Sequence, residues 1–523
     1  MTGSGAQQPH GHQTQESDAS LGYDGALALV GVGAGARAVA RLVVAAAAFV
    51  TTVLVVRLLG ADVFGFLAFG LSIVGLSNAI STGFGIAATR TLAARLASGD
   101  VEGAGEVTRG LVTVITFGGG VGLAVLLTII ALTQAQLDLS LRVTLGVGLG
   151  ILLIGHSAGV AGGAVARGFG RVVLMETPGV VEVVSKLLII VMLFVMGVSR
   201  LGVVAVGYGL AGIAAAIAAV VVVRLLHPGT YSIFRPNGSA GRRLIRITGP
   251  YAVVVIATTL IQGLDVAVLG ATHPGGPVGV YAPTLSLVQA LVMLPSIMLA
   301  ATFVTAATRL IEHGQVDGLS SLYLIVSRVS LLVAMPAFIV LAAAPEDALR
   351  LVFGSEFPTD PVVVRVLLVG FFVTVAFGLN GQALIATGER SRLLRAFALP
   401  GVTMLASSLM LIPPFGARGA AAATAVSFVV LNLSMAWALF KITGVHPFHR
   451  ALGTLVVTAP LPVAAATAAY ETNGGGIWVA PAVSLIAWVA WIVLARVLGA
   501  FRFQELKGFI PDALKRRPRG RDA

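Results

Sequence analysis

Long apolar runs alternate with short polar segments along almost the whole chain. Each run is roughly 18 to 25 residues long, which is the length that a helix needs to cross a bilayer. The runs are centred near residues 45, 74, 120, 153, 187, 212, 259, 291, 331, 374, 403, 430, 461 and 488. The pattern therefore predicts an all-α polytopic membrane protein with about fourteen transmembrane helices.

Composition supports this class and narrows the chemistry. Of the 523 residues 57% are hydrophobic and only 11% are charged, which is too apolar for a soluble globule of this size. The chain has no cysteine, so disulfides and thiolate metal sites are excluded. We find no Walker motif, metal-ligand cluster or nucleophile with an adjacent base. The sequence thus predicts no cofactor, no metal site and no enzymatic activity.

The basic residues are distributed unequally between the two sides of the predicted membrane. The net charge is +12, and 23 of the 34 lysines and arginines fall in the loops and tail of one side, against six on the other. This bias places the richer side, with both termini, in the cytoplasm of a cell membrane. The positive charge is hence a topological signal, and no nucleic-acid partner is predicted.

The chain contains an internal repeat. The stretch FGFLAFGLSIVG (64–75) aligns with VGVYAPTLSLVQ (278–289), so that Gly65 falls on Gly279, and AATR at 87–90 recurs at 306–309. The repeat predicts two six-helix lobes of the same orientation, related by an axis along the membrane normal. The expected segments are a disordered cytoplasmic tail (1–24), an N-lobe (25–226), a cytoplasmic inter-lobe loop (227–247), a C-lobe (248–441), a terminal helix pair (442–499) and a basic cytoplasmic tail (500–523).

Short motifs along the two lobes resemble a known family. They are RLLGADVFGFLAF (57–69), DVAVLG (265–270) with VGVY (278–281), VFGSEF (352–357), LIATGE (384–389) and IPPFGARGAAAAT (412–424). Their order and spacing are similar to those of the polysaccharide flippases of the multidrug/oligosaccharidyl-lipid/polysaccharide exporter superfamily, over roughly residues 25–445. The resemblance implies two six-helix lobes with two added helices. It also implies export of undecaprenyl-pyrophosphate-linked oligosaccharide from the inner to the outer leaflet, among membrane lipids and polysaccharide assembly proteins.

Two arginines in the first helix fit such a substrate. Arg37 and Arg41 are four residues apart and so lie on one side of the helix. Each costs about 2.5 to 3.5 kcal/mol at a helix centre in lipid, unless a polar group faces it. Guanidinium groups bind phosphates through paired hydrogen bonds, so both are predicted to hold the pyrophosphate. The alternative is that they snorkel to the cytoplasmic interface. Gln262 and Gln289 are predicted to contact sugar hydroxyls.

Four other charged residues are candidates for gating or ion coupling. Asp265 is expected either to titrate as a proton or sodium site or to pair with Arg57 at an extracellular gate. If its helix ends early, it is an ordinary interfacial carboxylate. Glu182 and Lys186 are four apart in the fifth helix, where they form either a self-neutralising pair inside one lobe or a coupling or substrate contact.

Uncharged polar residues and prolines also interrupt the apolar runs. His156, Asn78 and Asn380 are predicted to form hydrogen bonds between helices. Pro283 and Pro295 are predicted to bend the eighth helix, either for rocking motions or for packing alone.

Two other functions remain open. A multidrug extrusion transporter shares the expected fold, although the basic residues and the additional helix pair argue against it. A membrane glycosyltransferase or polysaccharide polymerase is the alternative from another class. The longest loops, 227–247 and 345–361, are too short for the outer domain that such an enzyme usually needs.

Overall fold

The computed structural model describes residues 42–227, 235–446, 449–476 and 478–500, and the regular elements within these ranges are all helices. Ten of them are long and apolar enough to cross a membrane, and up to twelve if each of two bent pairs counts as one span. The predicted class, an all-α polytopic membrane protein, is confirmed. The two predicted tails, 1–24 and 500–523, lie outside the described residues except for Ala500.

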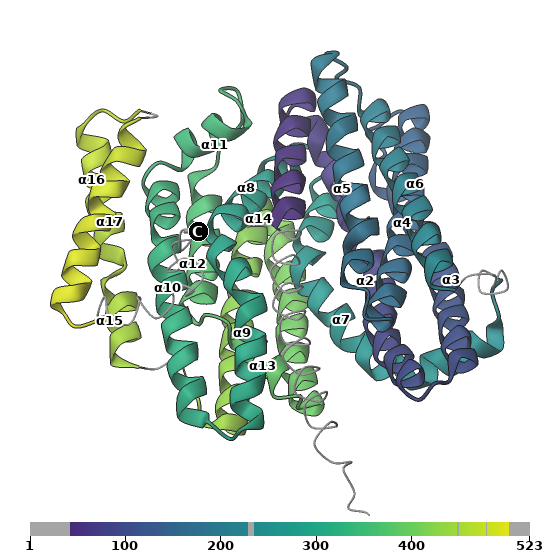
Figure 1. Cartoon of the computed structure of the whole chain (residues 1–523). Helices are drawn as coiled ribbons and strands as arrows, with labels where there is room; N and C mark the ends of the chain where they lie inside the picture. Colours follow the sequence, from purple (N-terminus) through teal and green to yellow (C-terminus); the bar gives the residue numbers. More distant parts are fainter. Residues whose placement is uncertain (1–41, 228–234, 447–448, 477, 501–523) are drawn as a thin grey trace, which may run out of the picture.

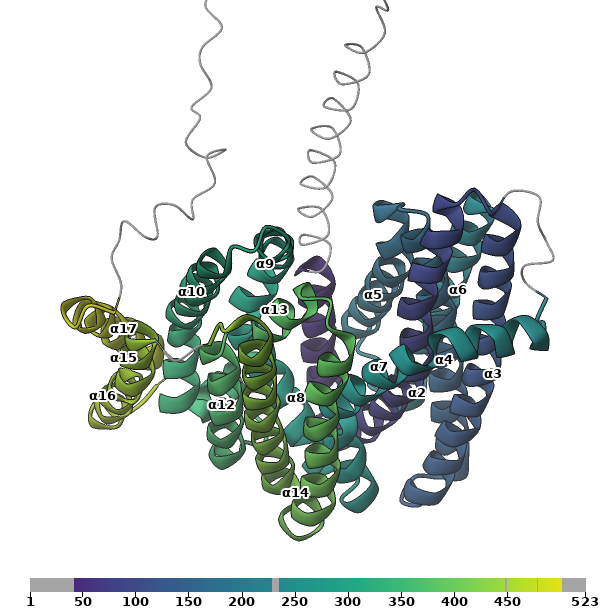
Figure 2. The same ribbon diagram turned by 90° about the horizontal axis from the view of Figure 1, so that it is seen from below.

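The helices form two bundles (Figure 1). The first span, Leu42–Leu59, lies between the bundles in both views (Figures 1 and 2). One bundle contains α2 (Ala61–Ala97), α3 (Val101–Thr133), α4 (Leu139–Gly168), α5 (Val172–Val195) and α6 (Leu201–Leu226). The other contains α8 (Gly276–Val292), α9 (Leu294–Glu312), α10 (Val316–Ala343), α11 (Pro345–Phe353), α12 (Pro361–Ala376), α13 (Asn380–Ala386) and α14 (Arg390–Thr443). We call the bundles the N-lobe and the C-lobe; α7 (Gly238–Thr272) packs against both, on α2 and on α14.

The predicted count of fourteen spans is not confirmed by this tally. All fourteen predicted centres lie within helices, but α14 counts only once. Its 54 residues form two arms, because Gly416 has non-helical torsions (φ 54°, ψ −130°) that reverse the chain direction. The other difference is α7, which is not among the twelve spans and of which Gly263–Thr272 is a short apolar segment. The hydropathy pattern locates α7 and both arms of α14, but it does not show where one helix ends and the next begins.

Small residues hold the N-lobe together. Gly148, Gly155 and Gly162 of α4 lie seven residues apart, and each faces a small residue of α6 that is 57 positions later. A β-carbon built on Gly155 would lie 2.0 Å from the carbonyl oxygen of Gly212. Only glycine permits such backbone contact, and small residues at a seven-residue period are typical of close helix pairs in membranes. The parallel α4–α6 pair therefore has the most extensive helix–helix contact among the described residues.

The C-lobe differs from the N-lobe in having broken helices. The α8–α9 pair bends by 54° at Met293, two residues before Pro295, whereas α2, its equivalent in the repeat, is continuous. The bend predicted at Pro295 is confirmed. Its cause is that proline lacks an amide hydrogen and clashes with the preceding turn. Pro283 lies inside α8 without interrupting it. A second bend of 41° separates α12 from α13, where Gly378 has a positive φ of 63°.

The predicted inter-lobe loop is partly helical. Helix α7 begins at Gly238, inside the expected loop 227–247, and the Asn237 side chain caps it by accepting from the backbone N–H groups of Ser239 and Ala240. The first turns lie on α3, where the Asn237 amide donates to Thr113 Oγ1 at 2.8 Å. The charged residues of this stretch suggested a loop, but they occupy the outer face of an amphipathic helix start. Helix α7 therefore runs from the N-lobe into the contact between the lobes (Figure 2).

The terminal helices form a separate layer at the far edge of the C-lobe. They are α15 (Arg450–Thr458), α16 (Pro460–Thr472) and α17 (Val479–Val497), with a break before Pro460. Trp488 Nε1 donates to the carbonyl of Leu332 in α10 at 3.0 Å, which fixes this layer to the lobe. In Figure 1 the layer lies far from the N-lobe.

Candidate functional site

The two lobes touch through backbone at one end of the molecule. A β-carbon on Gly65 of α2 would lie 1.9 Å from the carbonyl oxygen of Gly275, and one on Gly279 of α8 would lie 1.8 Å from that of Ala61. We call this contact the lobe seam. Gly65 and Gly279 are the positions that the repeat aligns, so equivalent parts of the two lobes meet here. The opposite end, where α2 ends beyond Arg90 and Arg95, is called the arginine-rich end.

Arg57 adds a second link beside the seam. It lies in the last turn of the first span, and its Nε and Nη2 donate to the carbonyls of Val352 and Leu351 at 2.9 and 2.8 Å. These carbonyls belong to the last turn of α11, where backbone acceptors have no partner within the helix and the helix dipole favours a cation. The predicted gate arginine thus joins the first span to the C-lobe. Asp265, the partner expected from the sequence, has other partners.

Asp265 is the most deeply buried carboxylate near the seam, with 1% of its surface exposed. Its Oδ2 accepts hydrogen bonds from Tyr281 Oη at 2.5 Å and from Thr424 Oγ1 at 2.8 Å. Its Oδ1 accepts from the backbone amide of Val266 at 2.8 Å. We call Asp265, Tyr281 and Thr424 the Asp265 cluster; it joins α7, α8 and α14.

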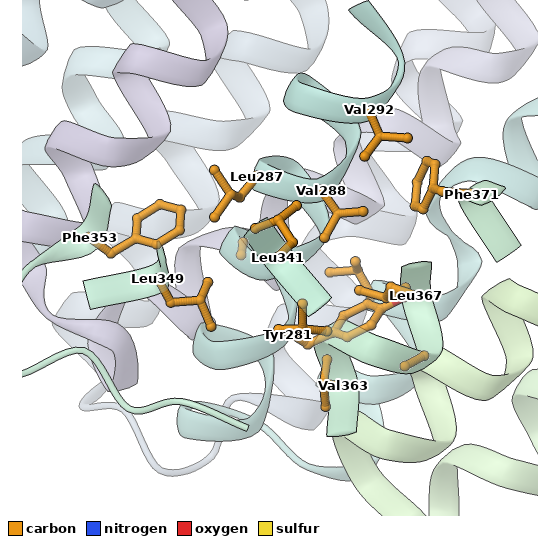
Figure 3. Packing of buried hydrophobic residues seen from close by; sticks show 14 of the residues in the cluster. Tyr281, Leu287, Val288, Val292, Leu341, Leu349, Phe353, Val363, Leu367 and Phe371 are labelled. Atoms are coloured by element: carbon orange, nitrogen blue, oxygen red, sulfur yellow. The ribbon is translucent and has the colours of Figure 1, made fainter. Parts of the chain in front are cut away.

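Apolar side chains surround the Tyr281 ring. Figure 3 shows it among side chains of α8, α10, α11 and α12, including Leu341, Val363 and Leu367. Within the part of the chain that the structure describes, no ion pair to Asp265 is found. An ionised carboxylate without a cation is costly in so apolar a setting, and carboxylate and hydroxyl oxygens are suited to a proton or a hard cation. The cluster can accept a positive charge.

The motifs that suggested the family converge on these contacts. Asp265 opens DVAVLG, Tyr281 ends VGVY and Thr424 ends IPPFGARGAAAAT, although 159 residues separate the first from the last. Arg57 opens the first motif, and its acceptor Val352 opens VFGSEF. Sequence reasoning did not single out Tyr281, Thr424 or Val352 as site residues. Their place in the motifs was the available signal.

A second polar cluster lies inside the N-lobe. Glu182 Oε1 pairs with Lys186 Nζ at 3.1 Å, and Glu182 Oε2 lies 2.8 Å from Nδ1 of His156 on α4. Lys186 Nζ also lies 5.0 Å from the centroid of the Tyr208 ring. The i,i+4 pair predicted inside one lobe is present, and His156 forms the predicted hydrogen bond between helices. We call Glu182, Lys186 and His156 the Glu182 cluster.

This cluster borders a cavity of about 290 Å³ between α2, α4 and α5. His156, Glu182, Arg167 and Glu176 supply its charged and polar lining. Both signs of charge are present, so the cavity has no strong preference for an anion. It is separate from the Asp265 cluster, which joins α7 to the C-lobe.

The other predicted contacts between helices are also found. Ser157 Oγ of α4 donates to Asn78 Oδ1 of α2 at 2.6 Å, and Asn380 Nδ2 donates to the carbonyl of Asn432 at 3.1 Å.

Of the remaining predicted site residues, only Gln289 has a side chain that the structure describes. Gln289 is exposed on α8, eight residues after Tyr281, whereas the Asp265 cluster is buried. Arg37 and Arg41 lie outside the described residues, as does the side chain of Gln262. The substrate contacts predicted for these four residues therefore stay predictions.

Two helical lobes that meet at a glycine seam, beside a buried carboxylate, have the architecture of a two-lobed membrane transporter. The sequence places the chain more narrowly. It belongs to the polysaccharide biosynthesis protein family, whose profile matches residues 30–344.

Individual relatives agree with this family. Over 228 residues, 44% of this chain, the sequence is 26% identical to the probable low-salt glycan biosynthesis flippase Agl15 of Haloferax volcanii. The match covers 48% of that protein, so the chain spans about half the length of this curated relative.

Solved structures show the same fold. The lipid II flippase MurJ in an inward closed conformation matches with a TM-score of 0.65 at 11% identity, over 87% of this chain and 99% of that one. An inward-facing multidrug resistance MATE family transporter of the MOP superfamily matches with a TM-score of 0.61 at 16% identity, over 78% and 98%. The resemblance predicted from the motifs is confirmed.

Proposed function

We propose that this protein is a flippase that moves undecaprenyl-pyrophosphate-linked oligosaccharide from the inner to the outer leaflet of the cell membrane. It works by alternating access of its two lobes, without ATP hydrolysis and without catalysing sugar transfer. Family membership supports the carrier class, and the resemblance to polysaccharide flippases supports the substrate. Both termini lie in the cytoplasm in this proposal, and the lobe seam faces outward.

The observation that carries the proposal is the pair of contacts at one end of the lobes. The lobe seam and the Arg57 link close the outer end through glycine backbone contacts and two hydrogen bonds, beside apolar side chains that pack across the lobes. Opening by rotation of the lobes about their interface would break these contacts, while helix pairs within one lobe, such as α4–α6, stay packed. Substrate enters from the inner leaflet while the seam is closed, and it leaves when the lobes rock about a central site and the seam opens.

The head group needs positive charge along its path. Arg37 and Arg41 are proposed to hold the pyrophosphate, with Gln262 and Gln289 contacting the sugars, while the prenyl chain stays in lipid. An inside-negative potential then favours outward movement of the anion, by about 2.3 kcal/mol per charge per 100 mV if the whole field is crossed.

Asp265 is proposed to couple a proton or a sodium ion to this movement. Tyr281, its hydrogen-bond donor, is two residues from Gly279 on the same helix. A cation at the carboxylate weakens that hydrogen bond, and α8 is thereby free to shift at the seam. Ion occupancy and closure of the outer end are in this way linked through a single helix.

The test uses liposomes that contain the purified full-length protein and a fluorescent polyprenyl-pyrophosphate oligosaccharide. Arg37→Ala with Arg41→Ala should lower the transport rate at least tenfold, and Asp265→Asn should remove its dependence on sodium or pH. Arg242→Ala and Asp317→Asn, which alter exposed residues at the arginine-rich end, are the matched controls.

Three results would contradict parts of this proposal. Undiminished transport by the double arginine variant removes those residues from the head-group site. Transport of cationic drugs but not of the lipid-linked sugar favours multidrug extrusion. Sugar transfer to an acceptor by the purified protein favours the glycosyltransferase alternative.

A further inference from the structure

A basic pocket lies between the two arms of α14, away from the lobe seam and from both polar clusters. It has a volume of about 610 Å³ and lies at the arginine-rich end. The first arm contributes Arg392 and Arg395, and the second contributes Trp437 and Lys441. The remaining lining residues are small or apolar apart from one serine: Ala396, Leu399, Ser434 and Ala438.

The pocket is one-sided in charge. Three of its eight described lining residues are cations, and none is a carboxylate. Two contacts hold the cations in place: Arg392 Nη1 donates to the carbonyl of Lys441 at 2.9 Å, and Lys441 Nζ lies 5.9 Å from the centroid of the Trp437 ring. The arms therefore place three exposed cations around one concavity, with contacts that orient Arg392 and Lys441.

Apolar stripes lead from this pocket along the arms. On the first arm Leu399, Val402, Leu405 and Leu409 follow Arg395 at helical spacing and are 46–64% exposed. On the second arm Leu433 and Trp437, four residues apart, precede Lys441 and are 47% and 66% exposed. These stripes belong to a segment that is apolar enough to cross the membrane, and their exposed apolar side chains suit contact with lipid.

An apolar groove adjoins the pocket on the other side of Trp437. It has a volume of about 510 Å³ and is lined by Leu433, Ala436, Trp437, Phe440 and His446. The tryptophan ring separates a cationic space from an apolar one. This arrangement matches a ligand with a charged head and a hydrocarbon chain.

We propose that the α14 pocket binds an anionic phospholipid of the inner leaflet, with its phosphate on Arg392, Arg395 and Lys441 and an acyl chain along Trp437 and the apolar stripes. Basic pockets between membrane helices on the cytoplasmic side bind anionic head groups in this way. Guanidinium pairs also match the planar donor geometry that a phosphate accepts. The site does not depend on the proposed flippase activity.

The experiment measures quenching of Trp437 fluorescence by brominated lipid. The full-length protein and its Trp437→Phe variant are reconstituted with brominated phosphatidylglycerol or brominated phosphatidylcholine, and their difference reports on Trp437 alone. We expect the lipid fraction at half-maximal quenching to be at least about fivefold lower for phosphatidylglycerol than for phosphatidylcholine. Equal quenching by the two lipids overturns the proposal.

Charge variants test which residues create the preference. Substituting Arg392, Arg395 and Lys441 by Gln should bring the two lipids to the same half-maximal fraction. The matched control substitutes Gln for the three exposed arginines at the start of α7, Arg242, Arg243 and Arg246, and should keep the preference. If the control variant also loses the preference for phosphatidylglycerol, or if the pocket variant keeps it, the preference arises from general surface charge and the specific site is rejected.

Competition separates the phospholipid from the flippase substrate. Unlabelled phosphatidylglycerol should restore Trp437 fluorescence. Undecaprenyl phosphate at the same mole fraction should restore no more fluorescence than phosphatidylglycerol does. Displacement by undecaprenyl phosphate alone overturns the assignment and makes the pocket part of the substrate path. Both results are obtained without a transport assay. The lipid-binding test therefore remains valid even if the protein proves not to be a flippase.

Discussion

A β-carbon built on Gly65 would lie 2.9 Å from the backbone nitrogen of Gly279, so neither α2 nor α8 leaves room for a side chain where the lobes meet. These glycines occupy equivalent positions in the two copies of the repeat. Contact between equivalent residues is expected close to an axis that relates two lobes of the same orientation. The seam is therefore a direct product of the internal repeat.

Gly65→Ala should disturb the seam, whereas Gly75→Ala in the same helix should not. The added methyl at Gly65 meets backbone atoms, but no heavy atom lies within 4 Å of a β-carbon at Gly75. Spin labels at Asp62 and Pro277, introduced as cysteines into a chain that has none, report the distance between the lobes. We expect a longer distance and at least tenfold slower transport for Gly65→Ala. An unchanged distance in that variant would show that the seam accommodates a side chain.

Arg57→Gln should loosen α11 without unfolding the C-lobe. Two charge-assisted hydrogen bonds to Leu351 and Val352 are lost, and each contributes up to about 1 kcal/mol at an exposed site. Hydrogen exchange over 345–353 should rise several-fold. Arg200→Gln, an exposed arginine before α6, serves as the control. Equal exchange in the two variants would mean that Arg57 does not hold α11.

Tyr281→Phe and Tyr323→Phe each remove a hydroxyl group that donates a hydrogen bond, and the two hydroxyls have different acceptors. Tyr281 donates to the carboxylate of Asp265, whereas Tyr323 donates to the backbone carbonyl of Phe377. Hydrogen bonds to charged groups contribute about 1.5–3 kcal/mol and those to neutral groups about 0.5–1.5 kcal/mol. Thermal unfolding in detergent should show the larger drop in midpoint for Tyr281→Phe. Equal drops would indicate that Asp265 is neutral in this conformation.

The Glu182 cluster can be tested with a double-mutant cycle. Lys186→Met leaves Glu182 with only His156, and Glu182→Gln leaves Lys186 without its carboxylate. Breaking a buried pair on one side costs about 3–5 kcal/mol, so each single variant should unfold at a clearly lower temperature. The double variant should recover most of that loss. If it is stable but inactive in transport, the cluster has a role beyond packing.

Asp100 should make the start of α3 sensitive to acid. The amide of Gly103, and then the hydrogen bond from Arg95, lower the pKa of Asp100 below its usual value of 3.8. Because the folded-state pKa is lowered, this stabilisation is complete above pH 3.8 and is lost as the pH falls through the folded-state pKa.

The measurement compares unfolding midpoints of the protein and of Asp100→Ala at pH 7 and near pH 3. The difference between them should shrink at the lower pH. Asp138→Ala, at an N-cap without a side-chain hydrogen bond, should show no such trend. A difference at Asp100 that stays constant across this range would rule out ionisation as its cause.

The sequence alone determined the class, the repeat and several charged candidates. Apolar runs of membrane length and an i,i+4 pair such as Glu182–Lys186 depend on residues close in the chain, so local spacing reveals them. The alignment of Gly65 with Gly279 also required no coordinates. Asp265 and Arg57 stood out because charge within or beside an apolar run is rare.

Tertiary structure decided the partners of those residues and the divisions of the helices. Thr424 is 159 positions from Asp265, and Val352 is 295 from Arg57, so no local pattern joins them. The reversal at Gly416 and the helical start at Gly238 depend on backbone torsions and on packing against α3. Periodicity describes one helix at a time, whereas a contact between lobes depends on which faces of distant helices meet.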